Sequence, residues 1–328
     1  MDGQTNLAPD TLAQKAEMKT IVIGGAGFIG SLVSQALIQS GREVTIVGRS
    51  APGPHTSSLG CAYRCADLGN RAQMREILEP GCEVIDLAYA TVPKTSYSDP
   101  AFDLLANLPG SVGLLEESMV AGVRRLLLVS SGGTVYGPPQ VLPIQESHPT
   151  APISPYGITK LTIEHYALMF HHTRDLPVVV VRPANAYGVN QRSRTGQGFL
   201  AAAIDAILSR RAIEIYGPSG TIRDYIHVTD VATGILAALN LGLDGEIYNL
   251  GTGIGASNLD VISLLRPLTE SCGYSIQVNQ LPSRRFDVEA NVLDCQKLSS
   301  VSGWRAQVSL LQGLAEMWDH TLTKSSIP

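Results

Sequence analysis

Short β-branched runs alternate with segments of helical spacing along the first half of the chain. The first run ends in a glycine-rich turn and passes directly into a segment whose apolar positions recur with helical periodicity. The predicted strands are Thr20–Ile23, Val44–Val47, Glu83–Ala88, Leu126–Ser130 and Val178–Val181. The predicted helices are Ser31–Gln39, Arg71–Leu78, Asn107–Ala121 and Pro155–His172.

This alternation predicts an α/β fold with a Rossmann-type doubly wound parallel sheet. Apolar strands with helices between them are typical of a sheet that is covered on both faces. We expect residues 18–182 to form this dinucleotide-binding domain, after a polar N-terminal tail at 1–17. A strand near 247–251, at Tyr248–Leu250, could rejoin the same sheet.

The pattern loosens after Arg182, and we expect residues 183–328 to form a smaller C-terminal α/β lobe that binds the substrate. The elements expected there are a polar loop at Tyr187–Gly196, helices at Phe199–Arg210 and Val228–Asn240, and a strand at Ile213–Tyr216. Thr229 or Asp230 is the expected N-cap of the second helix, because both side chains accept hydrogen bonds from helix amides.

The composition argues against several classes of protein. Hydrophobic residues make up 44% of the 328 residues and charged residues 16%, which argues against disorder and is consistent with a surface partly covered by a partner subunit. The net charge is −5, so neither nucleic acid nor an anionic membrane is an expected partner. No apolar run reaches the roughly 18 residues that span a bilayer, and no basic-then-apolar leader is present, so we expect a cytoplasmic protein.

The five cysteines do not predict a disulfide framework or a metal site. Cys61 and Cys65 are the nearest pair, and no second Cys or His pair completes a zinc site with them. We therefore expect free thiols in a reducing compartment and no bound metal.

Gly24, Gly27 and Gly30 are spaced G-x-x-G-x-x-G between the first strand and the first helix. Phosphates bind at such a turn because backbone N–H groups converge there with the positive end of the helix. An ordinary tight turn is the alternative interpretation. The order of strand, glycines, helix and second strand favours a dinucleotide site.

The second strand ends in Val47-Gly48-Arg49-Ser50, where a site that prefers NAD usually has an acidic residue for the adenosine ribose. No carboxylate is present at that point. Arg49 could face a 2′-phosphate, which favours NADP, or it could be a solvated side chain at the end of a strand. Asp67 is a better candidate for the adenine edge than for the ribose.

Tyr156 and Lys160 are four residues apart on a predicted helix, so they project from the same face, one turn apart. A free phenol has a pKa of about 10 and is a poor base at neutral pH. A neighbouring ammonium favours the phenolate and makes it usable for proton transfer. The pair is therefore a candidate acid/base centre.

These motifs together resemble the extended short-chain dehydrogenases/reductases, within them the NAD-dependent epimerase/dehydratase family, and most nearly the UDP-hexose 4-epimerases. The resemblance extends from about residue 19 to 318 of the sequence. The matching segments are Gly24–Gly30, Tyr156 with Lys160, Ser130–Gly137, Val181–Asn185, Arg223–Val228 and Tyr248–Gly251.

The resemblance implies roles for individual residues. Tyr156 corresponds to the acid/base on the sugar 4-hydroxyl, while Lys160 holds the nicotinamide ribose. NAD is the implied cofactor, with NADP as the alternative that Arg49 allows. The implied cofactor contacts are Gly24, Gly27, Phe28, Ile29, Gly30, Arg49, Ser50, Asp67, Leu68, Leu87, Ala88, Tyr89, Asn107, Ser130, Tyr156 and Lys160. The implied substrate contacts are Lys94, Asn185, Tyr216, Arg223, Arg284 and Asn291.

The residue types on the substrate side suit a nucleotide diphosphate. Such a group brings about two negative charges, and arginine guanidinium groups donate paired, directional hydrogen bonds to its oxygens. Arg223 and Arg284 are therefore candidate diphosphate ligands, and Tyr216 could stack on a base.

The chain departs from the family pattern at Gly132, where most relatives have a Ser or Thr that bridges the tyrosine and the sugar oxygen. Ser131 is our first candidate for that hydroxyl and Thr134 our second. Sister enzymes that eliminate water or carbon dioxide carry an acidic residue in this segment, and this chain has none. Asn291 lies where a bulky aromatic restricts some epimerases, so an N-acetylhexosamine is expected to fit.

Two functions follow from the resemblance. The first is a 4-epimerase of a UDP-sugar, which acts through a 4-keto intermediate without net consumption of cofactor. The second is an NADPH-dependent reductase of a nucleotide-linked 4-keto-deoxysugar, and Arg49 favours it. A cofactor-sensing scaffold is a third interpretation, which the Tyr156–Lys160 pair opposes. The family also implies a homodimer through the helices at 107–121 and 156–172.

Overall fold

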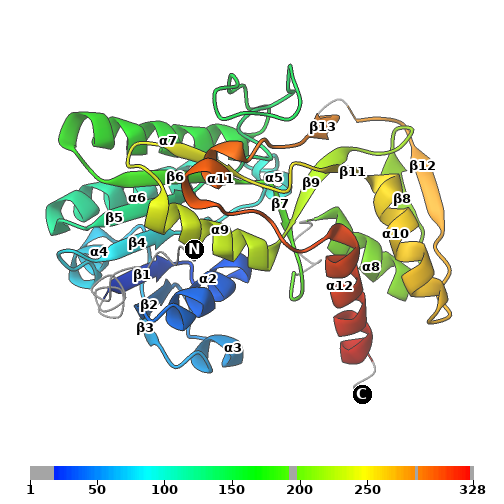
Figure 1. Ribbon diagram of the computed structural model, residues 1–328, viewed down its shortest axis with the longest axis horizontal. Helices are drawn as coiled ribbons and strands as arrows, with labels where there is room; N and C mark the ends of the chain where they lie inside the picture. Colours follow the sequence, from blue (N-terminus) through cyan, green and yellow to red (C-terminus); the bar gives the residue numbers. More distant parts are fainter. Residues whose placement is uncertain (1–17, 192–197, 285–286, 326–328) are drawn as a thin grey trace, which may run out of the picture.

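The computed structural model describes residues 18–191, 198–284 and 287–325. The predicted N-terminal tail, and residues 192–196 of the predicted polar loop, lie outside these ranges. Figure 1 shows a large part, built on one parallel sheet with helices on both sides, and a smaller lobe that carries the C-terminal helix.

Seven parallel strands form the central sheet in the order β10-β6-β5-β4-β1-β2-β3. Their bounds are β1 Lys19–Ile23, β2 Glu43–Gly48, β3 Ala62–Cys65, β4 Glu83–Asp86, β5 Arg125–Val129, β6 Val178–Pro183 and β10 Ile247–Leu250. The predicted Rossmann-type fold is confirmed, and the strand at Ile247–Leu250 pairs with β6. The strand order reverses between β1 and β4, where ligands of such sheets bind beyond the carboxyl ends.

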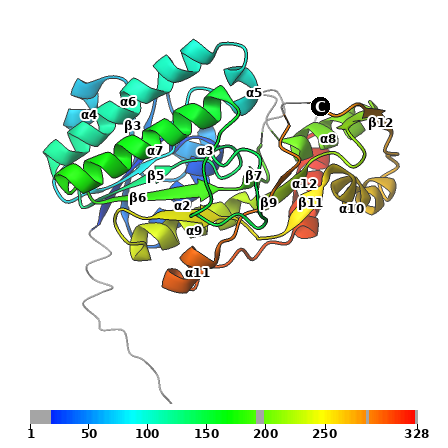
Figure 2. The same ribbon diagram turned by 90° about the horizontal axis from the view of Figure 1, so that it is seen from above.

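Helices cover both faces of this sheet. On one face lie α2 (Phe28–Gln39) and α9 (Val228–Leu241), and on the other lie α4 (Arg71–Ile77), α6 (Pro100–Ala121) and α7 (Pro155–Arg174). Figure 2 shows α6 and α7 side by side, with α2 and α9 across the sheet from them. Each face has its own cluster of buried apolar side chains, because both faces of every central strand are covered.

Several elements differ from the prediction, most of them by one or two residues at an end. Helix α6 begins at Pro100 rather than Asn107, because Asp99 caps it through the Phe102 amide (2.9 Å) and the helix continues through Pro109. Helix α2 begins at Phe28, directly after the N-cap Gly27. Strand β3 was not predicted, because it is a short, mostly exposed edge strand without an apolar run.

The predicted cap of α9 is wrong. Its N-cap is His227, which makes no side-chain cap hydrogen bond. The two expected residues have other partners: the Thr229 hydroxyl bonds His227 Nδ1 (2.7 Å), and the Asp230 carboxylate accepts from the Val308 amide (2.9 Å). Strand and helix therefore join with no loop between them.

The smaller lobe contains short strands, several helices and a third apolar cluster. Its elements are β7 Asn185–Tyr187, α8 Phe199–Leu208, β8 Ile213–Tyr216, β9 Ile222–His227, β11 Gly255–Ser257, α10 Asn258–Glu270, β12 Val278–Leu281, β13 Ala290–Asn291 and α12 Leu310–Ser325. Strand β9 pairs with β7, β11 and β13, and β8 pairs with β12. The short helices α3 (Pro54–Ser57), α5 (Pro93–Ser96) and α11 (Gln296–Ser302) complete the described chain.

A buried carboxylate joins β9 to the segments that return from the large sheet. Asp224 is fully buried and accepts from the Thr252 amide (2.9 Å) and hydroxyl (2.6 Å), the Gly253 amide (3.1 Å) and the Leu293 amide (3.3 Å). The Asp224 side chain thus holds the backbone at 252–253, directly after β10, and at Leu293, directly after β13, against β9.

Asp224→Ala leaves those buried donors without an acceptor. We expect the free energy of unfolding to fall by about 3 kcal/mol or more, since each unpaired buried donor costs about 1–3 kcal/mol. Asp205→Ala is the matched control, because its ion pair with Arg211 is exposed and contributes less than about 1 kcal/mol. Urea unfolding of both variants checks this; equal losses would contradict the role of Asp224.

Candidate active site

The glycine turn after β1 depends on the absence of side chains. Gly24 has a φ of +78°, and its amide donates to the Val47 carbonyl at 2.8 Å. A Cβ on Gly24 would lie 3.0 Å from the Ala88 amide, and one on Gly30 would overlap the Gly24 carbonyl oxygen. Only glycine therefore lets the turn, the start of α2 and the end of β4 approach one another.

The start of α2 is suited to an anion. Gly27 caps the helix without a side chain, and the first turn carries no acidic residue. The amides around Phe28 and Ile29 and the positive end of the helix can therefore meet a diphosphate. This cradle, which any Cβ would fill, fits the dinucleotide that the sequence predicts.

The loops after β2 and β3 present exposed polar side chains near this cradle. Arg49 and Ser50 are exposed. Asp67 is also exposed, and its carboxylate accepts from the Gly69 amide at 2.9 Å, so it stabilises its own turn. Leu68 is partly buried against the apolar cluster on the α6 face.

The segment after β4 is held from α6. The Asn107 side chain accepts from the Ala90 amide and donates to the Asp103 carbonyl, both at 2.7 Å. The Asp103 carboxylate in turn accepts from the hydroxyls of Tyr89 (3.3 Å) and Thr91. Leu87, Ala88 and Tyr89 are thereby fixed between the glycine turn and α7.

Tyr156 and Lys160 lie one turn apart on α7 and both contact Tyr89. The rings of Tyr156 and Tyr89 pack edge to face with centroids 4.7 Å apart. Lys160 Nζ lies 4.3 Å from the Tyr89 ring centre and donates to the Val129 carbonyl at 2.8 Å. Ser154 caps the helix through the Gly157 amide (3.1 Å), so the first turn that carries Tyr156 is well defined.

Burial controls the charges of these groups. It lowers the pKa of Lys160 to about 8, against the opposing effect of the Asp86, Glu164 and Asp103 carboxylates. It also raises the pKa of Asp86 to about 6 and the pKa of Tyr156 well above that of a free phenol. Near pH 7 the pair consists of an ammonium beside a neutral phenol.

The hydroxyl beside Tyr156 comes from Ser131, whose side chain lowers the pKa of the Tyr156 phenol against the effect of burial. Gly132 leaves no room for a side chain, since a Cβ would lie 2.5 Å from Leu293 Cδ1 and 2.8 Å from the Arg182 carbonyl oxygen. Thr134 Oγ1 is buried and finds no partner among the described residues. Of the two sequence candidates, only Ser131 meets the tyrosine.

A buried ion pair behind the site was missed by sequence reasoning. Glu164 on α7 and Arg182 on β6 are joined at 2.6 Å, with side chains 1% and 3% exposed. The Ser130 hydroxyl donates to the same carboxylate, so this predicted cofactor contact turns its side chain inward. The spacing of Tyr156, Lys160 and Glu164, each four apart, was the available signal.

The substrate-side residues fall into two groups. Arg284 lies 3.9 Å from the Tyr216 ring centre and is ion-paired with Asp287 at 2.8 Å; burial lowers the pKa of Arg223 beside them. Two of the remaining three adjoin this group through β9, since Asn291 pairs with Arg223 and Asn185 pairs with Tyr225. Lys94 is exposed, Asn185 donates to the Asp224 carbonyl (3.4 Å), and Asn291 is 1% exposed and donates to the Gly132 carbonyl (3.1 Å).

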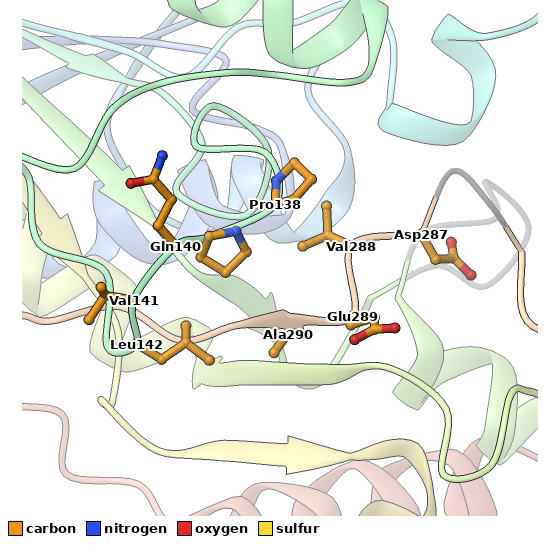
Figure 3. Close-up of a pocket in the computed structure, with 9 residues that line it drawn as sticks. Pro138, Gln140, Val141, Leu142, Asp287, Val288, Glu289 and Ala290 are labelled. Atoms are coloured by element: carbon orange, nitrogen blue, oxygen red, sulfur yellow. The ribbon is translucent and has the colours of Figure 1, made fainter.

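A cavity of about 420 Å³ opens between residues 138–142 and 287–290. Figure 3 shows Pro138, Val141 and Leu142 on one side and the strand segment with Val288 and Ala290 on the other. Asp287 lines this cavity and also pairs with Arg284. The cavity therefore adjoins the arginine group and is separate from the Tyr156–Lys160 pair.

Three further observations bear on the type of protein. Within residues 18–191, 198–284 and 287–325, no group of three His, Cys, Asp or Glu side chains could hold a metal ion. In the same part of the chain no helix is long and apolar enough to cross a membrane. All five cysteines are free.

The doubly wound sheet, the glycine cradle and the tyrosine–lysine pair define a class of dinucleotide-dependent α/β enzyme. A family model described as the NAD dependent epimerase/dehydratase family matches residues 20–251, and the chain belongs to this family. It is accordingly an enzyme whose cofactor is NAD.

The chain is similar to three proteins along nearly all of its length. It is 32% identical to a UDP-glucose 4-epimerase of Mycolicibacterium smegmatis, over 94% of this chain and 100% of the relative. A crystal structure of a Thermotoga maritima UDP-glucose 4-epimerase with UDP-glucose has a TM-score of 0.87 at 32% identity, covering 94% and 100% of the two chains. A Thermus thermophilus UDP-glucose 4-epimerase in complex with NAD has a TM-score of 0.83 at 32% identity, covering 92% and 98%.

The depressed pKa of Lys160 makes a prediction about stability. The folded state releases this proton near pH 8 and the unfolded chain near pH 10.5, so between these values the unfolded state binds more protons and stability rises with pH. Relative to Lys160→Met, the wild type should gain about 1 kcal/mol in unfolding free energy between pH 7 and 9. Denaturant unfolding at several pH values measures this, and a constant difference would contradict the shift.

Proposed function

We propose that this chain is a nucleotide-sugar 4-epimerase that interconverts UDP-glucose and UDP-galactose or their N-acetyl forms. The observation that carries the proposal is the Tyr156 phenol, beside Ser131 and one turn from the Lys160 ammonium, in a member of an NAD-dependent family. The similar UDP-glucose 4-epimerases support the choice of substrate.

The residues act as proton carriers and positioning groups. In its phenolate form, Tyr156 takes the proton of the sugar O4 as C4 is oxidised, and returns it after the 4-keto sugar has turned over in the site. Burial raises the pKa of Tyr156 and Ser131 lowers it. The Lys160 ammonium one turn away and the positive charge of bound NAD would favour the phenolate further, and the Ser131 hydroxyl would relay or orient the O4 proton. NAD, when bound, supplies the reversible hydride transfer at C4.

The rest of the molecule binds and orients the substrates. Residues 18–182 with the strand at 247–250 hold the cofactor, and residues 183–328 hold most of the nucleotide sugar. Arg223 and Arg284 would pair with the diphosphate, and the Tyr216 ring, now under the Arg284 guanidinium, would meet the base. Asp287 must release Arg284, wholly or in part, when the diphosphate arrives.

Elimination reactions fit this site less well. A dehydratase or a decarboxylase needs a proton donor other than the tyrosine, and residues 131–134 contain no carboxylic acid. Arg49 supports one other candidate, an NADPH-dependent reductase of a nucleotide-linked 4-keto-deoxysugar, because an exposed cation stands where an acidic ribose ligand is usual.

One preparation of the protein distinguishes the 4-epimerase from the NADPH-dependent reductase. The protein is purified without added cofactor and denatured, and the released NAD(H) or NADP(H) is identified. Native protein is then incubated with UDP-glucose and UDP-N-acetylglucosamine. The epimerase predicts retained NAD and formation of the 4-epimer with no net cofactor turnover. An empty protein that binds NADPH and leaves both sugars unchanged would instead support the reductase.

Substitutions at Tyr156, Ser131 and Thr134 distinguish the contributions of these three hydroxyl groups to catalysis. Tyr156→Phe should lower kcat by about 10²–10⁴-fold while NAD binding is retained, because only the proton transfer is lost. Ser131→Ala should lower kcat at least about tenfold. The matched control Thr134→Val removes a hydroxyl that makes no hydrogen bond with the described residues, and should change kcat less than about threefold. Steady-state kinetics checks this; a larger loss for Thr134→Val would reverse the assignment.

We further propose that the enzyme is a cytoplasmic homodimer formed through α6 and α7. These two adjacent helices expose large apolar side chains that a partner would cover. They are Phe102, Leu104, Leu105 and Val120 on α6, and Ile158, Tyr166 and Met169 on α7.

Charged substitutions on this face test the dimer. Leu105 and Ile158 are 67% and 51% exposed, so Leu105→Glu with Ile158→Glu should yield monomers without loss of the fold. Leu311→Glu on α12, at a position that is 48% exposed, is the matched control and should leave the dimer intact. Light scattering gives the molar mass, and a monomeric wild type would reject the proposal.

A further inference from the structure

The carboxyl end of β2 is occupied by a side chain from the neighbouring strand. Strand β3 lies at the edge of the sheet beside β2 (Figure 1). Gly48 at the end of β2 pairs with Cys65 of β3. Tyr63, two residues earlier on β3, extends over Gly48, and its hydroxyl donates to the Ser50 carbonyl at 2.5 Å. A Cβ built on Gly48 would overlap that hydroxyl.

The residue at position 48 and the position of the Tyr63 ring therefore depend on each other sterically. Any side chain at position 48 would have to displace the Tyr63 ring from its hydrogen bond with Ser50. Position 48 is where a site that prefers NAD usually carries the acidic ribose ligand. In this chain a phenol fills that place, and burial raises the pKa of Tyr63, so the group is neutral at physiological pH.

The side chains at the end of β2 are a guanidinium and a neutral phenol. Arg49 follows Gly48, is exposed, and makes no ion pair with the described residues. The nearest acidic side chain in the loop after β3 is Asp67, whose carboxylate already accepts from the Gly69 amide. A second phosphate on the adenosine ribose would meet a guanidinium here and no carboxylate at position 48.

We propose that the adenosine-ribose site of this enzyme accepts a 2′-phosphate, so that the chain binds NADP as well as NAD. Arg49 pairs with the 2′-phosphate. Tyr63 determines the specificity, because its ring fills the space that an acidic side chain at position 48 would need. The proposal rests on the dinucleotide site alone and is independent of the sugar that the enzyme turns over.

Two adenosine fragments test the site without any sugar or nicotinamide. Isothermal titration at low salt compares adenosine 2′,5′-bisphosphate with adenosine 5′-monophosphate. We expect the bisphosphate to bind at least about tenfold more tightly, and Arg49→Ala to remove that advantage. Arg64→Ala is the matched control, because Arg64 is an exposed arginine on β3, next to Tyr63, and its side chain alternates to the face opposite that of Tyr63.

A bisphosphate that binds no more tightly than the monophosphate would overturn the proposal. So would an advantage that survives Arg49→Ala or is lost equally in Arg64→Ala. Epimerase activity is measured separately with UDP-glucose, so loss of the proposed function and loss of this proposal give different results.

The role of Tyr63 is tested by introducing an aspartate at position 48, either alone or together with a smaller residue at position 63 that makes room for it. The double variant Gly48→Asp with Tyr63→Ser should bind the monophosphate at least about tenfold better than the bisphosphate, reversing the wild-type order. Gly48→Asp alone should have a lower Tm than the double variant, because Tyr63 blocks the new side chain. A single variant as stable as the double one, with the same fragment preference, would show that Tyr63 plays no part.

Discussion

The buried ion pair between Glu164 and Arg182 is the interaction on which the geometry of the site depends. Two charges with side chains 1% and 3% exposed are stable together only because each neutralises the other, and loss of one partner typically costs about 3–5 kcal/mol. The pair fixes α7 against β6, and α7 carries both Tyr156 and Lys160. The Glu164 carboxylate also accepts a hydrogen bond from Ser130 and raises the pKa of Lys160. Glu164 therefore affects both the position of α7 and the charge of the Lys160 side chain.

Two glycines in this chain stand where the family usually has a functional side chain, and each is enforced by packing. Leu293 and the Arg182 carbonyl fill the space beside Gly132, and the Tyr63 phenol fills the space beside Gly48. In the first case the neighbouring Ser131 meets the tyrosine instead. The departures are therefore adjustments of the local structure around a retained tyrosine–lysine pair, rather than losses of the site.

Features that depend on local spacing could be predicted from the sequence. The glycine turn, the order of the main strands and helices, and the helical spacing of Tyr156 and Lys160 all follow from residues close together in the chain. Contacts between distant segments could not be predicted. Strand β3 has no apolar run, so neither its pairing with β2 nor the position of Tyr63 over Gly48 was visible. The contact of Leu293 with Gly132 likewise depends on the return of the chain from the smaller lobe.

The most direct test of the account follows the hydrogen at C4 of the sugar. UDP-glucose labelled with deuterium at C4 is incubated with the enzyme, and the product is analysed by NMR and mass spectrometry. Reversible oxidation at C4 predicts that UDP-galactose forms with the deuterium still on C4 and with no change in the total reduced cofactor. Label lost from the sugar into free cofactor, with no 4-epimer formed, would contradict the epimerase and show net oxidation instead.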